Sequence, residues 1–192
     1  MDKKPDIAPS NQSMRMNCAL TEHPEYANYI ANIITLWNGT EHALGSVFAL
    51  LIGTDPWHAG KILGALNNSG AKIDLVESAG NYTLEYSLRL AEFSALLVEL
   101  RSAIATRNIY AHGVYAIDNE GRLNIIRQGR DWQSQKGRKL IDIPQLKVQW
   151  EKSMAAFNHV TRFHNALTQE MPPSPSAAWL YRCSTQTLTR RT

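Results

Sequence analysis

The stretch RNIYAHG, residues 107–113, divides the chain into two parts whose hydrophobic patterns differ. From about residue 83 up to this stretch, apolar residues recur every three or four positions, as they do on one face of a helix. Beyond it the period changes to two, which is typical of a strand. Gly113 is expected to adopt the left-handed conformation that commonly ends a helix. The pattern therefore predicts a long helix over residues 83–110, followed by a strand.

Three helices are predicted ahead of the long one. Helical spacing of apolar residues predicts one helix over residues 24–52, with a weak point at Asn38 and Gly39; two stacked helices are the alternative interpretation. Asp55 as cap and Pro56 in the first turn predict a short helix to about residue 66. A further short helix is expected over residues 71–79, ended by the Gly80-Asn81 pair.

The buried stripe of the long helix and the elements after it complete the predicted fold. The expected stripe consists of Leu84, Leu88, Ala91, Ala95, Leu97, Leu100 and Ile104. Strands at residues 114–117 and 122–127 flank a hairpin turn, and residues 140–143 add a candidate third strand. Pro144 opens the last helix. These elements predict a mainly α fold, an up-and-down helical bundle with a small β-hairpin inserted before the last helix.

Length and charge define the expected domain organisation. A chain of 192 residues suits one domain, which we place at residues 24–170 between a flexible leader (1–23) and a flexible tail (171–192). The tail contains three arginines and no acid, so it accounts for the whole net charge of +3. The rest of the chain is neutral overall, which excludes the general basicity of a protein that coats nucleic acid.

The two cysteines, Cys18 and Cys183, lie in the two predicted tails. Their number and spacing exclude a disulfide framework and a zinc-binding pattern, and a reducing, cytoplasmic setting is expected. No apolar run has the length of a signal peptide or a membrane span, so no membrane association is expected. His159 and His164 are five residues apart, whereas metal-binding pairs on a helix prefer four, so no metal site is predicted.

Arg107 and His112 are the candidate chemical groups. An arginine that stays charged and an imidazole that titrates near neutrality are the groups needed to cleave a phosphodiester. Five steps of roughly 100° place them about 140° apart on a regular helix. They are therefore expected to converge only if the last turn loosens or if a second chain supplies the complement. A structural interpretation also fits, because the helix dipole favours a histidine in the last turn without any function.

Residues 107–112 resemble the motif of the HEPN superfamily. That motif is an arginine, usually followed by a polar residue, with a histidine four to six residues after the arginine at the end of a core helix. Asn108 fills the polar position. The resemblance covers six residues and implies a helical bundle that forms homodimers. Many members are metal-independent endoribonucleases that act as toxins or in phage defence, and others are non-catalytic binders.

The resemblance implies catalytic roles for Arg107, Asn108 and His112. His112 would deprotonate a ribose 2′-hydroxyl, Arg107 would stabilise the phosphorane charge, and Asn108 would orient the histidine or the phosphate. No metal or other cofactor is required, because the nucleophile belongs to the RNA. An antitoxin or regulatory protein is a further expected partner. The alternative is a non-catalytic dimeric module that binds RNA, a nucleotide or a protein.

A basic segment follows the motif directly. Residues 122–139 contain six basic residues and one acid, a net charge of +5, together with one tryptophan. Such a segment can follow a phosphate backbone and stack a base, although a solvated hairpin tip is an equally good interpretation. The residues expected to contact substrate are Tyr110, Arg122, Arg127, Arg130 and Trp132.

Glu41 is the candidate supporting residue. It interrupts an apolar pattern in the first predicted helix, which suggests a carboxylate that pairs with a cation. Arg107 is the expected partner, since a buried cation needs one. The alternative is a polar break in a partly exposed face.

Overall fold

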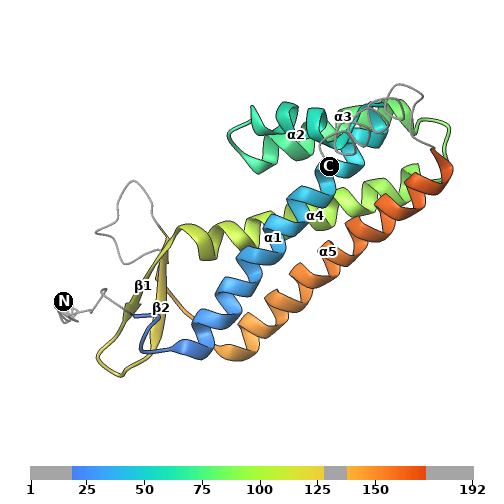
Figure 1. Ribbon diagram of the computed structural model, residues 1–192. Helices are drawn as coiled ribbons and strands as arrows, with labels where there is room; N and C mark the ends of the chain where they lie inside the picture. Colours follow the sequence, from blue (N-terminus) through green and yellow to red (C-terminus); the bar gives the residue numbers. More distant parts are fainter. Residues whose placement is uncertain (1–18, 128–137, 172–192) are drawn as a thin grey trace, which may run out of the picture.

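A computed structural model describes residues 19–127 and 138–171 of the chain. The helices are α1 (Pro24–Leu51), α2 (Pro56–Gly64), α3 (Ser69–Thr83), α4 (Leu90–His112) and α5 (Ile143–Glu170), and the strands are β1 (Gly113–Ile117), β2 (Leu123–Arg127) and β3 (Arg138–Leu140). The predicted mainly α fold, with a small sheet before the last helix, is confirmed (Figure 1). The predicted tails lie largely outside the described residues.

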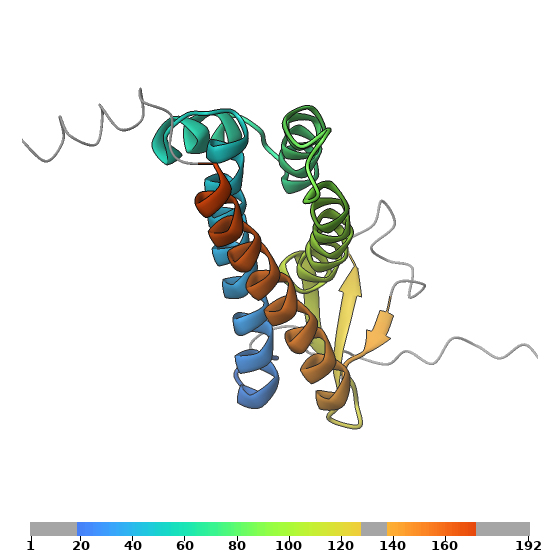
Figure 2. The same cartoon turned by 90° about the vertical axis from the view of Figure 1, so that its right-hand side faces the viewer.

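The three long helices form the body of the molecule. Figures 1 and 2 show α1, α4 and α5 running alongside one another, with α2 and α3 at one end and the sheet at the other. Two hydrophobic clusters follow this division. The first joins all five helices and contains Phe93 stacked on Phe163 with ring centroids 5.6 Å apart. The second joins α1, α4, α5 and the sheet around Ile33, Tyr110 and Ile125.

The first helix is continuous, so the interpretation as one helix is confirmed and the stacked pair is excluded. Gly39 lies inside α1, where a Cβ atom would come within 3.1 Å of the Phe157 ring on α5. The glycine therefore lets two long helices pack closely and does not break the chain. Ala19, which we had placed in the flexible leader, is buried in the second cluster, so the folded domain begins before residue 24.

The start of the long helix differs from the prediction. Helix α3 continues through Gly80 and Asn81 to Thr83, and α4 begins only at Leu90. A Cβ atom on Gly80 would lie 2.2 Å from the Phe93 ring, so this glycine allows α3 and α4 to pack closely. Thr83 Oγ1 also donates a hydrogen bond to the Leu51 carbonyl at 2.9 Å, which ties the end of α3 to the end of α1.

The predicted buried stripe is correspondingly only half right. Leu84, Leu97 and Leu100 are buried and Ile104 is half-buried, but Leu88, Ala91 and Ala95 are exposed. The core positions of α4 are Phe93, Leu96, Leu97, Leu100, Ala103 and Tyr110. Because the chain turns between α3 and α4, the helical phase that we read across residues 83–104 does not exist in the structure.

The three strands form an antiparallel sheet in the order β1-β2-β3. Gly113 pairs with Arg127 at the end of the hairpin next to α4, and Ile117 pairs with Leu123 at the turn. The third strand is Arg138–Leu140, slightly earlier than predicted, because Asp142 already caps α5 by accepting a hydrogen bond from the Gln145 amide at 2.7 Å. The sheet therefore packs against the end of the bundle where α4 stops and α5 starts.

Replacement of a helical glycine by alanine should have opposite effects on stability at positions 80 and 60. Gly80→Ala should destabilise the fold by about 1–3 kcal/mol, because its Cβ would overlap the Phe93 ring. Gly60→Ala is the matched control: it also lies in a helix, its Cβ would meet nothing within 4 Å, and it should stabilise the fold by about 0.5–1 kcal/mol. Urea unfolding measures both changes. Equal effects of the two substitutions would contradict the packing described for Phe93.

Candidate functional site

The junction between α4 and β1 positions the candidate site. Gly113 is extended, with φ −77° and ψ 146°, so the predicted left-handed helix end is wrong. The reason for a glycine is steric. A Cβ atom would lie 2.3 Å from Ile125 Cδ1 and 2.8 Å from the Ile109 carbonyl oxygen. Residue 113 must therefore lack a side chain so that β2 can pack against the last turn of α4.

A tyrosine on β1 also contacts the last turn of α4. The Tyr115 hydroxyl donates a hydrogen bond of 2.5 Å to the Tyr110 carbonyl, one of the carbonyl groups that loses its helical partner where α4 ends. Burial raises the pKa of Tyr115, so its phenol remains a protonated donor. This bond and the contact at Gly113 hold the backbone on both sides of His112.

Arg107 and His112 meet within one chain. Arg107 Nη1 lies 3.2 Å from His112 Nε2 and donates a second hydrogen bond of 3.0 Å to Asn108 Oδ1. Since α4 is helical through His112, the expectation that they converge only through a loosened last turn or a second chain is wrong. Side chains on a helix tilt toward its N-terminus, so His112 leans back toward the turn that carries Arg107, and the long arginine side chain spans the remaining distance.

The contact constrains the role of each group. A guanidinium only donates, so a hydrogen bond between Arg107 Nη1 and His112 Nε2 requires Nε2 to be the acceptor. Arg107 Nε is buried and has no hydrogen-bond partner among the described residues. Asn108 and His112 are exposed, and Arg107 is half-buried. The site thus combines an exposed histidine, whose Nε2 contacts Arg107, with a cation whose buried Nε has no partner among the described residues.

Tyr110 belongs to a different surface. It is buried in the second hydrophobic cluster, and burial, then the charge of Asp142, raises the pKa of its phenol. Together with Thr106 and Gln145 it lines a pocket of about 150 Å³ between α4, the sheet and α5. Helical geometry places this pocket on the face of α4 opposite Asn108 and His112. The structure therefore does not bring Tyr110 to the predicted site.

Glu41 is paired elsewhere. Its Oε1 atom accepts hydrogen bonds from Lys72 Nζ at 2.7 Å and from Ser69 Oγ at 3.2 Å, both at the start of α3. The predicted pairing with Arg107 is wrong, because α2 and α3 cover the part of α1 that carries Glu41. Sequence spacing could not reveal this pair, since its members are 31 residues apart.

The hairpin separates the predicted phosphate-binding residues. Arg122 lies at the turn, where its Nε donates to Asp118 Oδ2 at 3.0 Å and its Nη2 pairs with Glu120 at 2.7 Å. Four strand residues, roughly 14 Å, separate this turn from Gly113. Arg127 instead pairs with Gly113 in the sheet register, so its backbone lies beside the site. Arg130 and Trp132 lie outside the described residues.

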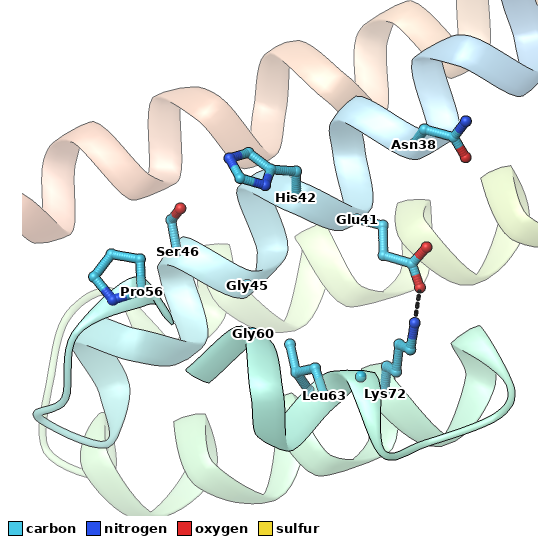
Figure 3. A pocket seen from close by; sticks show the side chains of 10 residues that line it. Asn38, Glu41, His42, Gly45, Ser46, Pro56, Gly60, Leu63 and Lys72 are labelled. Carbon is cyan, nitrogen blue, oxygen red and sulfur yellow. Dashed lines mark hydrogen bonds and ion pairs between the residues drawn. The ribbon is translucent and has the colours of Figure 1, made fainter. Parts of the chain in front are cut away.

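A second concave surface was not predicted. A groove of about 370 Å³ runs between α1 and α2 (Figure 3). Its lining comprises Asn38, Glu41, His42, Gly45, Ser46, Pro56, Gly60, Leu63, Gly64 and Lys72. Added Cβ atoms on Gly60 and Gly64 would meet nothing within 4 Å, so these glycines leave the groove wide open. Its mixed donors and acceptors suit a small polar molecule, but its residues come from three helices and share no sequence motif.

Comparisons with known proteins add no assignment. No family model, no curated protein and no solved structure matches the chain. Over the described residues, no group of three or more His, Cys, Asp or Glu side chains is placed to hold a metal ion. None of the helices in the described part of the chain has the length and apolarity to cross a membrane.

The lowered pKa of Asp118 predicts how the stability of the fold changes at low pH. The backbone amide of Arg122, and then its guanidinium, lower the pKa of Asp118 from 3.8 to about 2. A carboxylate whose pKa is lowered in the folded state stabilises the fold above its unfolded pKa, and this contribution is lost as the pH falls through the folded value. The unfolding temperature should therefore fall between pH 4 and pH 2, and Asp118→Asn should make this fall shallower. Parallel pH profiles for the two proteins would contradict the assignment.

Proposed function

We propose that the chain is a metal-independent endoribonuclease of the HEPN type, acting on single-stranded RNA in the cytoplasm. The observation that carries the proposal is the contact between Arg107 Nη1 and His112 Nε2 on an exposed helix end. A general base and a phosphate-binding cation must act on neighbouring atoms of one phosphodiester, and these two groups are already adjacent. The HEPN-like spacing of the same residues supports this choice of reaction.

The chain's own groups supply each proton transfer. A scissile phosphate attracts the Arg107 guanidinium, which releases the lone pair of His112 Nε2. Nε2 then takes the proton of the ribose 2′-hydroxyl, the 2′-oxygen forms a bond to phosphorus, and Arg107 stabilises the charge of the phosphorane. The bond from phosphorus to the 5′-oxygen breaks, and an imidazolium donates a proton to that oxygen. The products are a 2′,3′-cyclic phosphate and a 5′-hydroxyl end.

A homodimer is part of the proposal. A stripe of exposed residues on α4 leads to the site, and most of its side chains are small, apolar or uncharged: Ala91, Ser94, Ala95, Val98, Ser102, Ala105 and Asn108. The charged residues beside it, Glu99 and Arg101, pair with His159 and with Asp74 and Glu77. Val98 is 67% exposed. Two such stripes can pack about a twofold axis, because a twofold interface repeats one patch on both subunits. Two copies of His112 would then share one cleft, where one serves as base and the other as acid.

This proposal also includes an antitoxin or other regulatory protein as a partner, because a free ribonuclease would damage the cell that makes it. Of the two predicted RNA-binding arginines that the structure describes, Arg127 has its backbone beside the site, paired with Gly113 in the sheet register. If the chain binds RNA, a nucleotide or a protein without cleaving RNA, it is instead a non-catalytic dimeric module, and the next experiment separates these two functions.

His112→Ala should abolish cleavage of labelled single-stranded RNA in EDTA, because it removes the base. Arg107→Ala should lower the rate about a hundredfold, as loss of a preorganised charge stabiliser does. His42→Ala, which removes another exposed histidine, is the matched control and should cleave at the wild-type rate. All variants should keep the wild-type circular dichroism spectrum. Equal rates for wild type and His112→Ala, or no cleavage by wild type, would leave only the binding module.

The proposed dimer interface predicts that a charge at position 98 weakens both dimerisation and cleavage. Val98→Glu places like charges opposite each other across the twofold axis and should raise the dimer dissociation constant by about tenfold or more. Cleavage should fall in parallel, since two copies of the motif form the cleft. Val98→Ala, which keeps the stripe uncharged, should remain dimeric and active. Light scattering measures the dimer, and a fully active Val98→Glu monomer would show that one chain suffices.

A further inference from the structure

The connection between α3 and α4 carries an exposed apolar surface, far along the bundle from the α4–β1 junction. We call it the turn patch and define it as Tyr82, Tyr86 and Leu88, which are 86%, 94% and 102% exposed. Large apolar residues gathered on one exposed segment indicate an interaction surface more often than single exposed ones do. This is also where the predicted helix fails, because Leu88 fits a buried stripe by its spacing but lies on a turn.

The end of α5 brings the chain to the turn patch. Glu170 Oε1 accepts hydrogen bonds from Arg89 Nη2 at 2.7 Å and from Arg89 Nε at 3.0 Å, and Arg89 directly follows Leu88. Met171 packs against the first hydrophobic cluster. Figure 1 shows the end of α5 and the α3–α4 connection at the same end of the bundle. The chain therefore continues beyond residue 171 from a point next to the patch.

The sequence beyond this point contains a matching apolar segment. Residues 172–192 follow, and the run AAWLY at 177–181 is the strongest apolar stretch among them. Trp179 lies eight positions beyond Met171, which allows a reach of at most about 26–29 Å. Prolines at 172, 173 and 175 oppose continuation of α5, so the run is not expected to extend the helix away from the patch.

The charge of the residues beyond 171 complements the charge around the turn patch. The residues beyond 171 carry three arginines and no acid. Around the turn patch, Glu85, Glu92 and Glu170 face a single arginine, Arg89, which pairs with the last two. Within the described part of the chain, Glu85 has no ion-pair partner and lies next to Tyr86. Arg182 follows the AAWLY run directly, so docking of that run would bring a cation close to Glu85.

We propose that residues 177–182 dock in cis on the turn patch, with Trp179 and Leu180 covering Tyr86 and Leu88 and with Arg182 pairing with Glu85. The docked segment covers the end of the bundle where α3, α4 and α5 meet. This surface lies away from Arg107 and His112, so the proposal does not depend on ribonuclease activity. A second copy of the chain or a foreign protein are the rival occupants.

Cross-linking to the natural Cys183 tests the proposal in the full-length chain. A Cys18→Ser background leaves Cys183 as the only thiol. Asn81→Cys adds a thiol on the exposed last turn of α3 beside the patch. Asn158→Cys is the matched control, exposed on α5 about 20 Å before Met171 and within reach of an undocked tail. Under mild oxidation, the intramolecular disulfide should form about tenfold faster at position 81 than at 158, because docking raises the local thiol concentration.

Two further variants test whether docking causes the faster disulfide formation at position 81. Trp179→Ser alters only the proposed occupant, and Leu88→Asp alters only the patch. Each substitution should make the rates of disulfide formation at positions 81 and 158 nearly equal, with an unchanged circular dichroism spectrum. Equal rates at positions 81 and 158 in the starting protein would overturn the proposal. Disulfides that form only between chains, seen as dimers on a non-reducing gel, would overturn it in favour of a second copy. A preference that survives Trp179→Ser would also overturn it.

Discussion

The close approach of β2 to the last turn of α4 is the constraint on which the rest of the structure depends. At Gly113 there is no room for a Cβ atom between Ile125 and the Ile109 carbonyl. The helix ends at His112, and the chain leaves it at once as the extended strand β1. Tyr115 then satisfies a carbonyl group that the helix end leaves open. One steric requirement thus joins the sheet to the bundle and sets the position of the motif.

The same junction explains why Arg107 and His112 touch. A histidine near a fraying helix end would sample many positions, but here the backbone is held on both sides of it. Arg107 reaches its Nε2 atom and also contacts Asn108, while the arginine Nε remains unpartnered among the described residues. A buried donor without an acceptor is costly, so this group calls for an explanation.

The break between α3 and α4 has a different consequence. Gly80 brings α3 against Phe93, and the chain must then turn before α4 can begin. This changes the helical phase, so Ala91 and Ala95 face outward and form the stripe that leads to His112. It also places Leu88 on an exposed turn. The turn between α3 and α4 therefore decides the position of both proposed contact surfaces.

Local sequence patterns were sufficient to predict most of the helices and strands. Periodicity predicted the long α1 helix, the hairpin after Gly113 and the helix after Pro144, because each depends on neighbours within a few residues. The spacing from Arg107 to His112 likewise marked the candidate site. Only the tertiary structure decided the partner of Glu41, the burial of Tyr110 and the phase of α4. Those features depend on contacts such as Gly80 with Phe93 and Glu41 with Lys72, in which residues distant along the chain meet. Hydrophobic spacing shows that a residue has an apolar face to bury, but only the packed chain determines what buries it.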